Sequence, residues 1–311
     1  MFDEMTAQAP SPVADDEAPL GEALISDVWY VAALGRDVKP GRCAAIAICG
    51  GVLELARSLQ GEVSGLFDGR PARLAESEDL IWYFHEGPGA RPRDAAPQPR
   101  RFGGPKGKVR YCADVIIPAH QDDAAYGLLD PAHTPFVHKS PLWRGNGILK
   151  EKTKPFEPND FGFTMVPHAP VNSDIYNLIG GKIGVRIEFR LPGLRAEYIE
   201  NRKHTVLGLT ALTPVDNRHT RLRQIFYWNS PVLSLIRPIA PLAAKPFLNQ
   251  DVEIMRLRRE NEPHGGKGML LGDSDRQFIW YMQLKKEWQA ARHDGRPFRN
   301  TLSAQTLRWR T

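Results

Sequence analysis

Residues 150–228 alternate strand-like runs with short turns, and this pattern restricts the possible folds more than any other feature of the sequence. The runs are rich in β-branched and aromatic residues, and they cover residues 161–166, 182–191, 196–201, 204–213 and 222–228. Short connections between successive strands are typical of antiparallel sheets, because parallel neighbours need a long crossover. Helical patterns follow at residues 246–261 and 275–292. Strands followed by helices predict an α+β domain built on an antiparallel sheet.

Turn signals and proline content divide the 311 residues into four predicted segments. Residues 1–24 form an acidic tail that we expect to be disordered, and residues 25–87 form a small β unit punctuated by glycines. Residues 88–108 are rich in Pro, Gly and Arg and lack apolar periodicity, which predicts a linker. Residues 109–311 form the large domain. The length fits one large domain with a smaller appendage.

The charge of the chain is unevenly distributed. The net charge is +5, yet the first 22 residues contain six acidic residues and no Lys or Arg. The basic residues of the remainder are mostly dispersed, which argues against a nucleic-acid partner and favours docking of an acidic protein. The N-terminus lacks the pattern of a signal or transit peptide, and no apolar run reaches the roughly 18 residues of a membrane span. We therefore expect a cytoplasmic protein that does not act at a membrane.

Residues 127–138 contain the pattern Asp130-x2-His133-x4-His138. Asp130 is followed by Pro131, a pair that is typical of a helix N-cap and the first helical residue. Imidazole nitrogens suit iron, zinc or copper, and two histidines with one carboxylate leave coordination positions open. Alternatively, both histidines are helix-terminal or core residues with hydrogen-bond partners, and the spacing alone favours this alternative.

The predicted helix 246–261 contains a candidate for the carboxylate of such a site. Asp251 falls within an apolar stripe formed by Phe247, Leu248, Val252, Ile254 and Met255. An acidic residue on an apolar face is unfavourable unless it is paired or bound to a metal. Alternatively, Asp251 is a buried charge near the helix N-terminus that interacts with the helix dipole or with an arginine.

Together, residues 127–138 and the segment Asn249-Gln-Asp-Val-Glu-Ile-Met255 resemble the catalytic domain of the Rieske-type non-haem iron ring-hydroxylating oxygenases (alpha subunit). The resemblance covers most of residues 109–288 in the order of the elements. It implies a helix-grip (START-like) sheet with C-terminal helices, and mononuclear Fe(2+) bound by His133, His138 and Asp251. It also implies that Asp130 bridges a ligand histidine to the iron–sulfur cluster of a neighbouring subunit, usually in a trimer.

The sequence departs from this family in its cysteines. A Rieske [2Fe-2S] centre needs C-x-H and C-x2-H motifs. Cys43, Cys49 and Cys112 are the only cysteines, and none is followed by histidine at either spacing. We therefore expect that this chain binds no [2Fe-2S] cluster, and that residues 25–87 are a truncated remnant of the family's N-terminal domain. A second departure is Gly127, where many members carry Asn.

The resemblance implies an oxygenase component that activates O2 and hydroxylates or demethylates an aromatic or other apolar small molecule. Electrons would come from a separate Rieske or ferredoxin protein and its reductase, within a homo- or hetero-trimer. A second hypothesis is a non-catalytic relative that binds a hydrophobic ligand or stabilises an active oxygenase. A zinc hydrolase is a third, because the same residue types bind zinc.

Overall fold

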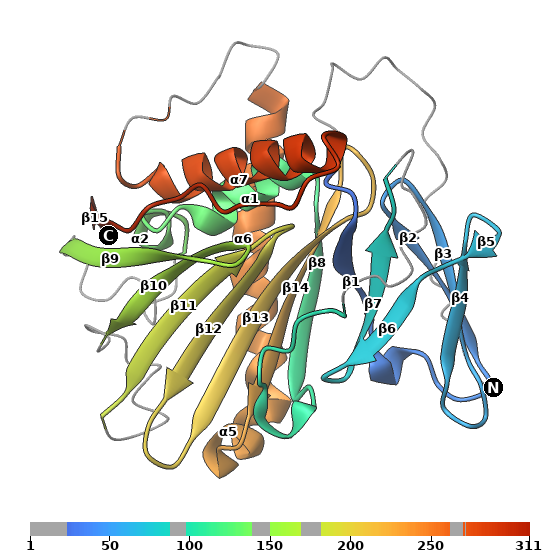
Figure 1. The fold of residues 1–311 in the computed structure, drawn as a ribbon. Coiled ribbons are helices and arrows are strands. Elements are labelled where there is room, and N and C mark those ends of the chain that lie inside the picture. Colours follow the sequence, from blue (N-terminus) through green and yellow to red (C-terminus); the bar gives the residue numbers. More distant parts are fainter. Residues whose placement is uncertain (1–23, 88–97, 139–149, 169–181, 262–269, 271) are drawn as a thin grey trace.

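The computed structural model describes residues 24–87, 98–138, 150–168, 182–261, 270 and 272–311. Its N-terminal part consists of two small antiparallel sheets, with strand orders β1-β7-β6 and β2-β3-β4-β5 (Figure 1). The strands are β1 (Val28–Leu34), β2 (Cys43–Ile48), β3 (Gly51–Arg57), β4 (Val63–Phe67), β5 (Arg70–Pro71), β6 (Leu74–Ser77) and β7 (Leu80–His85), with the 3-10 helix η1 (Gly35–Asp37) after β1. The predicted small β unit is therefore present.

One eight-stranded antiparallel sheet dominates the rest of the chain, in the order β15-β9-β10-β11-β12-β13-β14-β8. The strands are β8 (Tyr111–Ile117), β9 (Glu151–Asn159), β10 (Gly162–His168), β11 (Gly184–Arg190), β12 (Leu194–Glu200), β13 (Thr205–Pro214), β14 (Thr220–Trp228) and β15 (Gln305–Arg310). The five predicted strands correspond to β10 through β14. Together with the C-terminal helices, this sheet confirms the predicted antiparallel α+β class.

The helices lie before and after the central strands in the sequence. They are α1 (Gln121–Leu129), α2 (Thr134–Val137), α5 (Pro231–Ile236), α6 (Ala240–Asn261) and α7 (Arg276–His293), with 3-10 helices η2 (Pro105–Gly107) and η3 (Arg237–Ile239). The helix predicted from residue 246 begins six residues earlier, and Pro246 lies inside it. Within the described part of the chain, no helix is both long enough and apolar enough to span a membrane.

The two faces of the large sheet have different neighbours. On the inner face, Phe189 of β11 packs against Tyr281 of α7, and Phe163 of β10 packs against Trp280. On the outer face, Ala196, Tyr198, Leu209 and further apolar residues join a core cluster with Val31, Trp82 and Phe102 of the N-terminal part. The helices thus cover the inner face, and the small β unit packs on the outer face.

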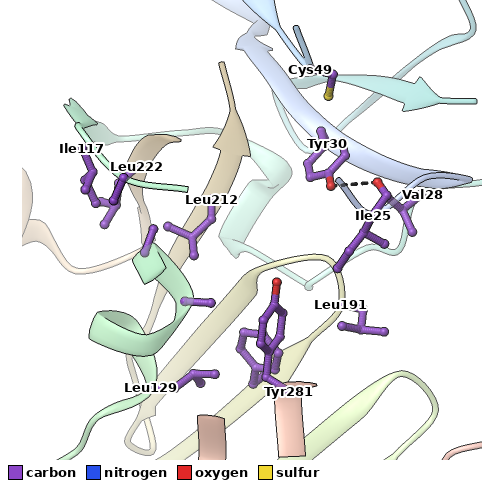
Figure 2. Close-up of a cluster of buried hydrophobic side chains, with 14 of the residues drawn as sticks. Ile25, Val28, Tyr30, Cys49, Ile117, Leu129, Leu191, Leu212, Leu222 and Tyr281 are labelled. Carbon is purple, nitrogen blue, oxygen red and sulfur yellow. Dashed lines mark hydrogen bonds between the residues drawn. The ribbon is translucent and has the colours of Figure 1, made fainter. Parts of the chain in front are cut away.

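Hydrogen bonds also join the small β unit to the large sheet and its helices. The Tyr30 hydroxyl lies 2.9 Å from the Ile25 carbonyl oxygen, the bond dashed in Figure 2, and 3.0 Å from Gln121 Oε1 at the start of α1. Figure 2 places this tyrosine near Leu191 and Tyr281, within one continuous core cluster. The backbone N–H of Cys49 donates to the Pro214 carbonyl at 2.8 Å. The predicted β unit is therefore packed on the large sheet and not an isolated body.

Part of the predicted linker is also held to the small β unit by hydrogen bonds. The Glu78 carboxylate accepts the backbone N–H groups of Phe102, Gly103 and Gly104 at 2.6, 2.8 and 2.9 Å. The Phe102 ring is buried and stacks on Trp82. Residues 98–108 therefore run as a docked segment along the β unit. Residues 88–97 of the predicted linker and residues 1–23 of the predicted tail lie outside the described residues.

Candidate metal centre

Asp130 ends a helix, whereas the sequence predicted that it begins one. Helix α1 has His120 as its N-cap, and the His120 ring accepts the backbone N–H of Asp122 at 3.2 Å. Asp130 is the C-cap, with φ −78° and ψ 107°, because Pro131 disfavours helical dihedrals in the residue before it. Its carboxylate accepts the N–H of Ala132 at 2.7 Å and turns the chain into α2.

The two histidines lie at the two ends of α2. His133 is the residue before the first turn, and His138 follows the last, with its N–H donating to the Thr134 carbonyl at 3.1 Å. A single short helical turn therefore brings the two imidazoles to the same side. Their ring centroids are 5.4 Å apart with an interplanar angle of 71°. The two histidines are therefore helix-terminal, as the alternative expected from the spacing alone has it, and their rings also lie next to each other, as the resemblance implied.

Both rings are oriented through their Nδ1 atoms. His133 Nδ1 lies 2.5 Å from the backbone oxygen of Asp130, and His138 Nδ1 lies 3.2 Å from Gln250 Oε1. Carbonyl and amide oxygens only accept hydrogen bonds, so these contacts assign the proton to Nδ1 in each neutral ring. The lone pair is then on Nε2, the arrangement that a hydrogen-bond acceptor at Nδ1 imposes on a metal-binding histidine. Gln250 was not predicted as a site residue from the sequence.

Asp251 completes the group from α6. Its Oδ1 lies 3.5 Å from His138 Nε2, and one potential ligand atom from each of His133, His138 and Asp251 lies within 4.8 Å of the others. Two acceptors, an imidazole lone pair and a carboxylate oxygen, thus point toward each other. Such an arrangement is favourable when a cation lies between them, and two imidazoles with one carboxylate form the facial ligand set of non-haem iron.

Burial controls the protonation of this group. His138 is 1% exposed and stacks on Phe247 with centroids 3.7 Å apart. Burial lowers the pKa of His138 to about 4, and the adjacent His133 acts in the same direction. His138 is therefore neutral at pH 7, and its contact with Asp251 is not an ion pair. Burial also raises the pKa of Asp251 to about 6, and raises that of Asp130.

Helix α6 presents most of the predicted apolar stripe to the core. Leu248 and Met255 are buried, and Phe247 and Val252 pack against the same cluster. Ile254 is 44% exposed, contrary to the prediction, because consecutive helical residues are about 100° apart and Met255 occupies the centre of the buried face. Asp251 lies in the middle of α6, so the alternative of a charge near the helix N-terminus is wrong.

Gly127 allows α1 and α6 to approach each other closely. A Cβ atom at this position would overlap Cε of Met255, the end of a flexible side chain. Met255 is one turn beyond Asp251 on α6, so its methyl group fills the space that a side chain at position 127 would occupy. A larger residue at position 127 would therefore force the Met255 side chain of α6 to move.

Structural comparison finds solved proteins with the same fold. Dicamba monooxygenase bound to 3,6-dichlorosalicylic acid matches with a TM-score of 0.65 at 16% identity, over 86% of this chain and 98% of that chain. Dicamba monooxygenase with non-heme iron and dicamba gives 0.61 at 15% identity, over 88% and 99%. Pseudomonas putida CBB5 NdmA (QL mutant) with theobromine gives 0.63 at 12%, over 86% and 91%.

The chain shares the fold of these proteins. At such low identities the likeness establishes the architecture, and it agrees with the element order expected from the sequence. No protein-family model and no curated protein sequence matches the chain.

Proposed function

We propose that the chain is a mononuclear non-haem iron oxygenase component. The observation that carries this proposal is the convergence of His133, His138 and Asp251, with both histidines held by acceptors at Nδ1. The donor set fits Fe(2+), and the shared fold supports it, since one solved structure with this fold carries non-heme iron. Iron bound there would supply the activation of O2.

The surrounding residues prepare this site. The backbone oxygen of Asp130 and the amide oxygen of Gln250 fix the two rings, and fixed ligands bind a metal with less reorganisation. Phe247 covers one face of the His138 ring and excludes water from it. The Asp130 carboxylate accepts the backbone N–H groups of Ala132 and His133, which positions the first ligand.

The reaction that we propose is hydroxylation or demethylation of an aromatic or other apolar small molecule. Solved proteins with this fold carry dicamba, theobromine and caffeine. Because the sequence lacks the cysteine–histidine motifs of a Rieske centre, the electrons would come from a separate Rieske or ferredoxin protein with its reductase. Asp130 would face that donor as the electron-transfer bridge, within a trimer.

Metal analysis of the anaerobically purified, Fe(2+)-reconstituted chain tests the proposal. We expect about one iron per chain, because one group of three ligands is present in the described residues. Folded protein that binds no iron would contradict the oxygenase and support the non-catalytic, ligand-binding alternative. Zinc bound in preference to iron, with no reactivity toward O2, would support the hydrolase alternative.

Gln250→Leu is expected to lower iron affinity by about 10- to 100-fold, because His138 loses the acceptor that orients its ring. Competition with a chromophoric chelator measures the change. The matched control is Asn249→Leu, since Asn249 is the neighbouring amide on α6 and is exposed. Equal iron affinity in the two variants would show that Gln250 does not orient the ligand.

A further inference from the structure

An apolar surface is exposed where α5, η3 and the first turn of α6 follow one another. Leu235 of α5 and Leu242 of α6 are 82% and 78% exposed. Val232 of α5 and Ile239 of η3 are also exposed, at 49% and 61%. Single exposed aliphatic residues are common on folded proteins, whereas a group of them marks an interaction surface. These four residues are called the aliphatic patch below.

The four side chains belong to one surface. They are separated by steps of three, four and three residues, and such steps place neighbouring residues on the same side of a helix. The backbone keeps helical dihedrals through the junction, at Ile236, Arg237 and Ala240. Figure 1 shows α5 at the lower end of the large sheet, whereas α7 lies across its upper end. The aliphatic patch is therefore at one end of the molecule.

The charges that accompany the patch in the sequence are all positive. Residues 229–250 contain Arg237 and Lys245 and no Asp or Glu. Arg237 lies within the aliphatic patch, and Lys245 follows it by one turn of α6. Both side chains are exposed. Any surface that covers the patch must therefore tolerate two cations, and a negatively charged surface would be attracted by them.

The turn between β12 and β13 brings two further cations to the same end. Arg202 and Lys203 lie in this turn and are exposed. The turn is held to the start of α5, because the Thr205 N–H donates to Asn229 Oδ1 at 2.9 Å and the Asn229 N–H donates to the Thr205 carbonyl at 3.3 Å. Glu200 is the only acidic residue among residues 200–205. In the described part of the chain, none of the four cations forms an ion pair.

This combination fits the surface of a membrane better than the surface of a protein. A second copy of the chain would bring the same cations face to face, and like charges across an interface repel each other. The cores of protein interfaces are enriched in Tyr, Trp and Arg, whereas the patch contains only Val, Leu and Ile. Aliphatic side chains can enter the boundary of the lipid tails, while cations bind the anionic headgroups around them.

We propose that the aliphatic patch and the four cations bind the surface of an anionic phospholipid bilayer. The chain would lie on the bilayer and not cross it. The sequence predicted no action at a membrane, because no apolar run is long enough to span one, but binding at the surface needs no such run. The patch is separate from the proposed metal ligands, and the proposal does not depend on the oxygenase function.

Flotation of the full chain with phospholipid vesicles tests this proposal. One set of vesicles is phosphatidylcholine alone, and the other is an equal mixture of phosphatidylcholine and the anionic lipid phosphatidylglycerol. We expect the chain to partition at least about tenfold more strongly onto the mixed vesicles, because each cation near an anionic surface favours binding. Added salt should weaken this binding, because it screens the charge of the headgroups.

Leu242→Ser should weaken partitioning onto the mixed vesicles by about tenfold or more, because it removes an aliphatic side chain that enters the lipid. Ile254→Ser is the matched control. Ile254 is also an exposed aliphatic residue of α6, at 44%, but it lies about three turns beyond the patch. This variant should partition like the unchanged chain. Circular dichroism confirms that each variant is folded.

Lys245→Gln should weaken partitioning onto the mixed vesicles by about fivefold, because it removes one cation from the anionic surface. Lys286→Gln is the control for this change. Lys286 is an exposed lysine of α7, at the other end of the large sheet, and its replacement should leave partitioning unchanged (Figure 1).

If the chain does not float with the mixed vesicles, or if Leu242→Ser and Ile254→Ser partition equally, the proposal is wrong. Light scattering then shows what covers the patch. A dimer that Leu242→Ser dissociates would assign the patch to a contact between copies of the chain, and a monomer would favour an acidic protein partner. Iron content is measured separately, so the membrane surface and the oxygenase function can fail independently.

Discussion

Asp251→Ala is expected to reduce the iron content of the reconstituted chain from about one per chain to near zero. Asp251 supplies the only carboxylate of the proposed ligand group in the described residues, and its loss leaves two imidazoles. Loss of a residue that only hydrogen-bonds to a metal ligand typically costs about 10- to 100-fold in metal affinity. Loss of a ligand itself should therefore cost more than about 100-fold. His133→Ala should behave in the same way. Metal analysis after gel filtration measures both effects.

Glu253→Ala is the matched control for this substitution. Glu253 also lies on α6, but its side chain is 54% exposed and pairs with Arg256 on the solvent side. Its replacement should leave iron content unchanged and should alter stability little, because exposed ion pairs contribute little to folding. Retention of one iron per chain by Asp251→Ala would show that the metal is held elsewhere.

Asp122→Ala is expected to lower the free energy of unfolding by about 3–5 kcal/mol. Asp122 Oδ2 lies 2.5 Å from Nζ of Lys285, whose side chain is 2% exposed, and Oδ1 accepts the Tyr281 hydroxyl at 2.6 Å. The substitution leaves a buried ammonium without its carboxylate. This effect is a large part of the 5–15 kcal/mol that stabilises a typical domain. Denaturant titration measures it.

The neighbouring residue provides the control. Asp123 pairs with Arg258, but both side chains are about two-fifths exposed, at 40% and 41%. Asp123→Ala should cost at most about 1 kcal/mol, as exposed ion pairs generally do. If both variants unfold at the same denaturant concentration, the Asp122–Lys285 pair contributes no more than a surface pair. The result also bears on the site, because α1 leads directly to Asp130 and His133.

The sequence predicts the centre of the large sheet well and its periphery poorly. Strands β10 to β14 are rich in apolar, aromatic and β-branched residues, many of which are buried in the structure. Strand β9 was not predicted, since its sequence EKTKPFEPN contains lysines and prolines that are depleted in strands. Pairing with β10 and β15 overrides these local preferences.

The proposed ligand group was predictable only in part. The spacing of His133 and His138 places both at the ends of one short turn, and a local pattern can carry that information. The roles of Gln250 and Phe247 depend on how α6 packs against α2, which no local pattern specifies.

Oxygen uptake by the iron-loaded chain tests the central claim most directly. The chain is combined with a reductase, a panel of Rieske and ferredoxin donors and a panel of aromatic and other apolar small molecules, and uptake is followed with an oxygen electrode. We predict uptake that needs the iron-loaded chain, a donor and one of the candidate substrates together, and that is absent in Asp251→Ala. Uptake that is equal with and without iron in the chain, or absent with every donor although iron is bound, would contradict the oxygenase function.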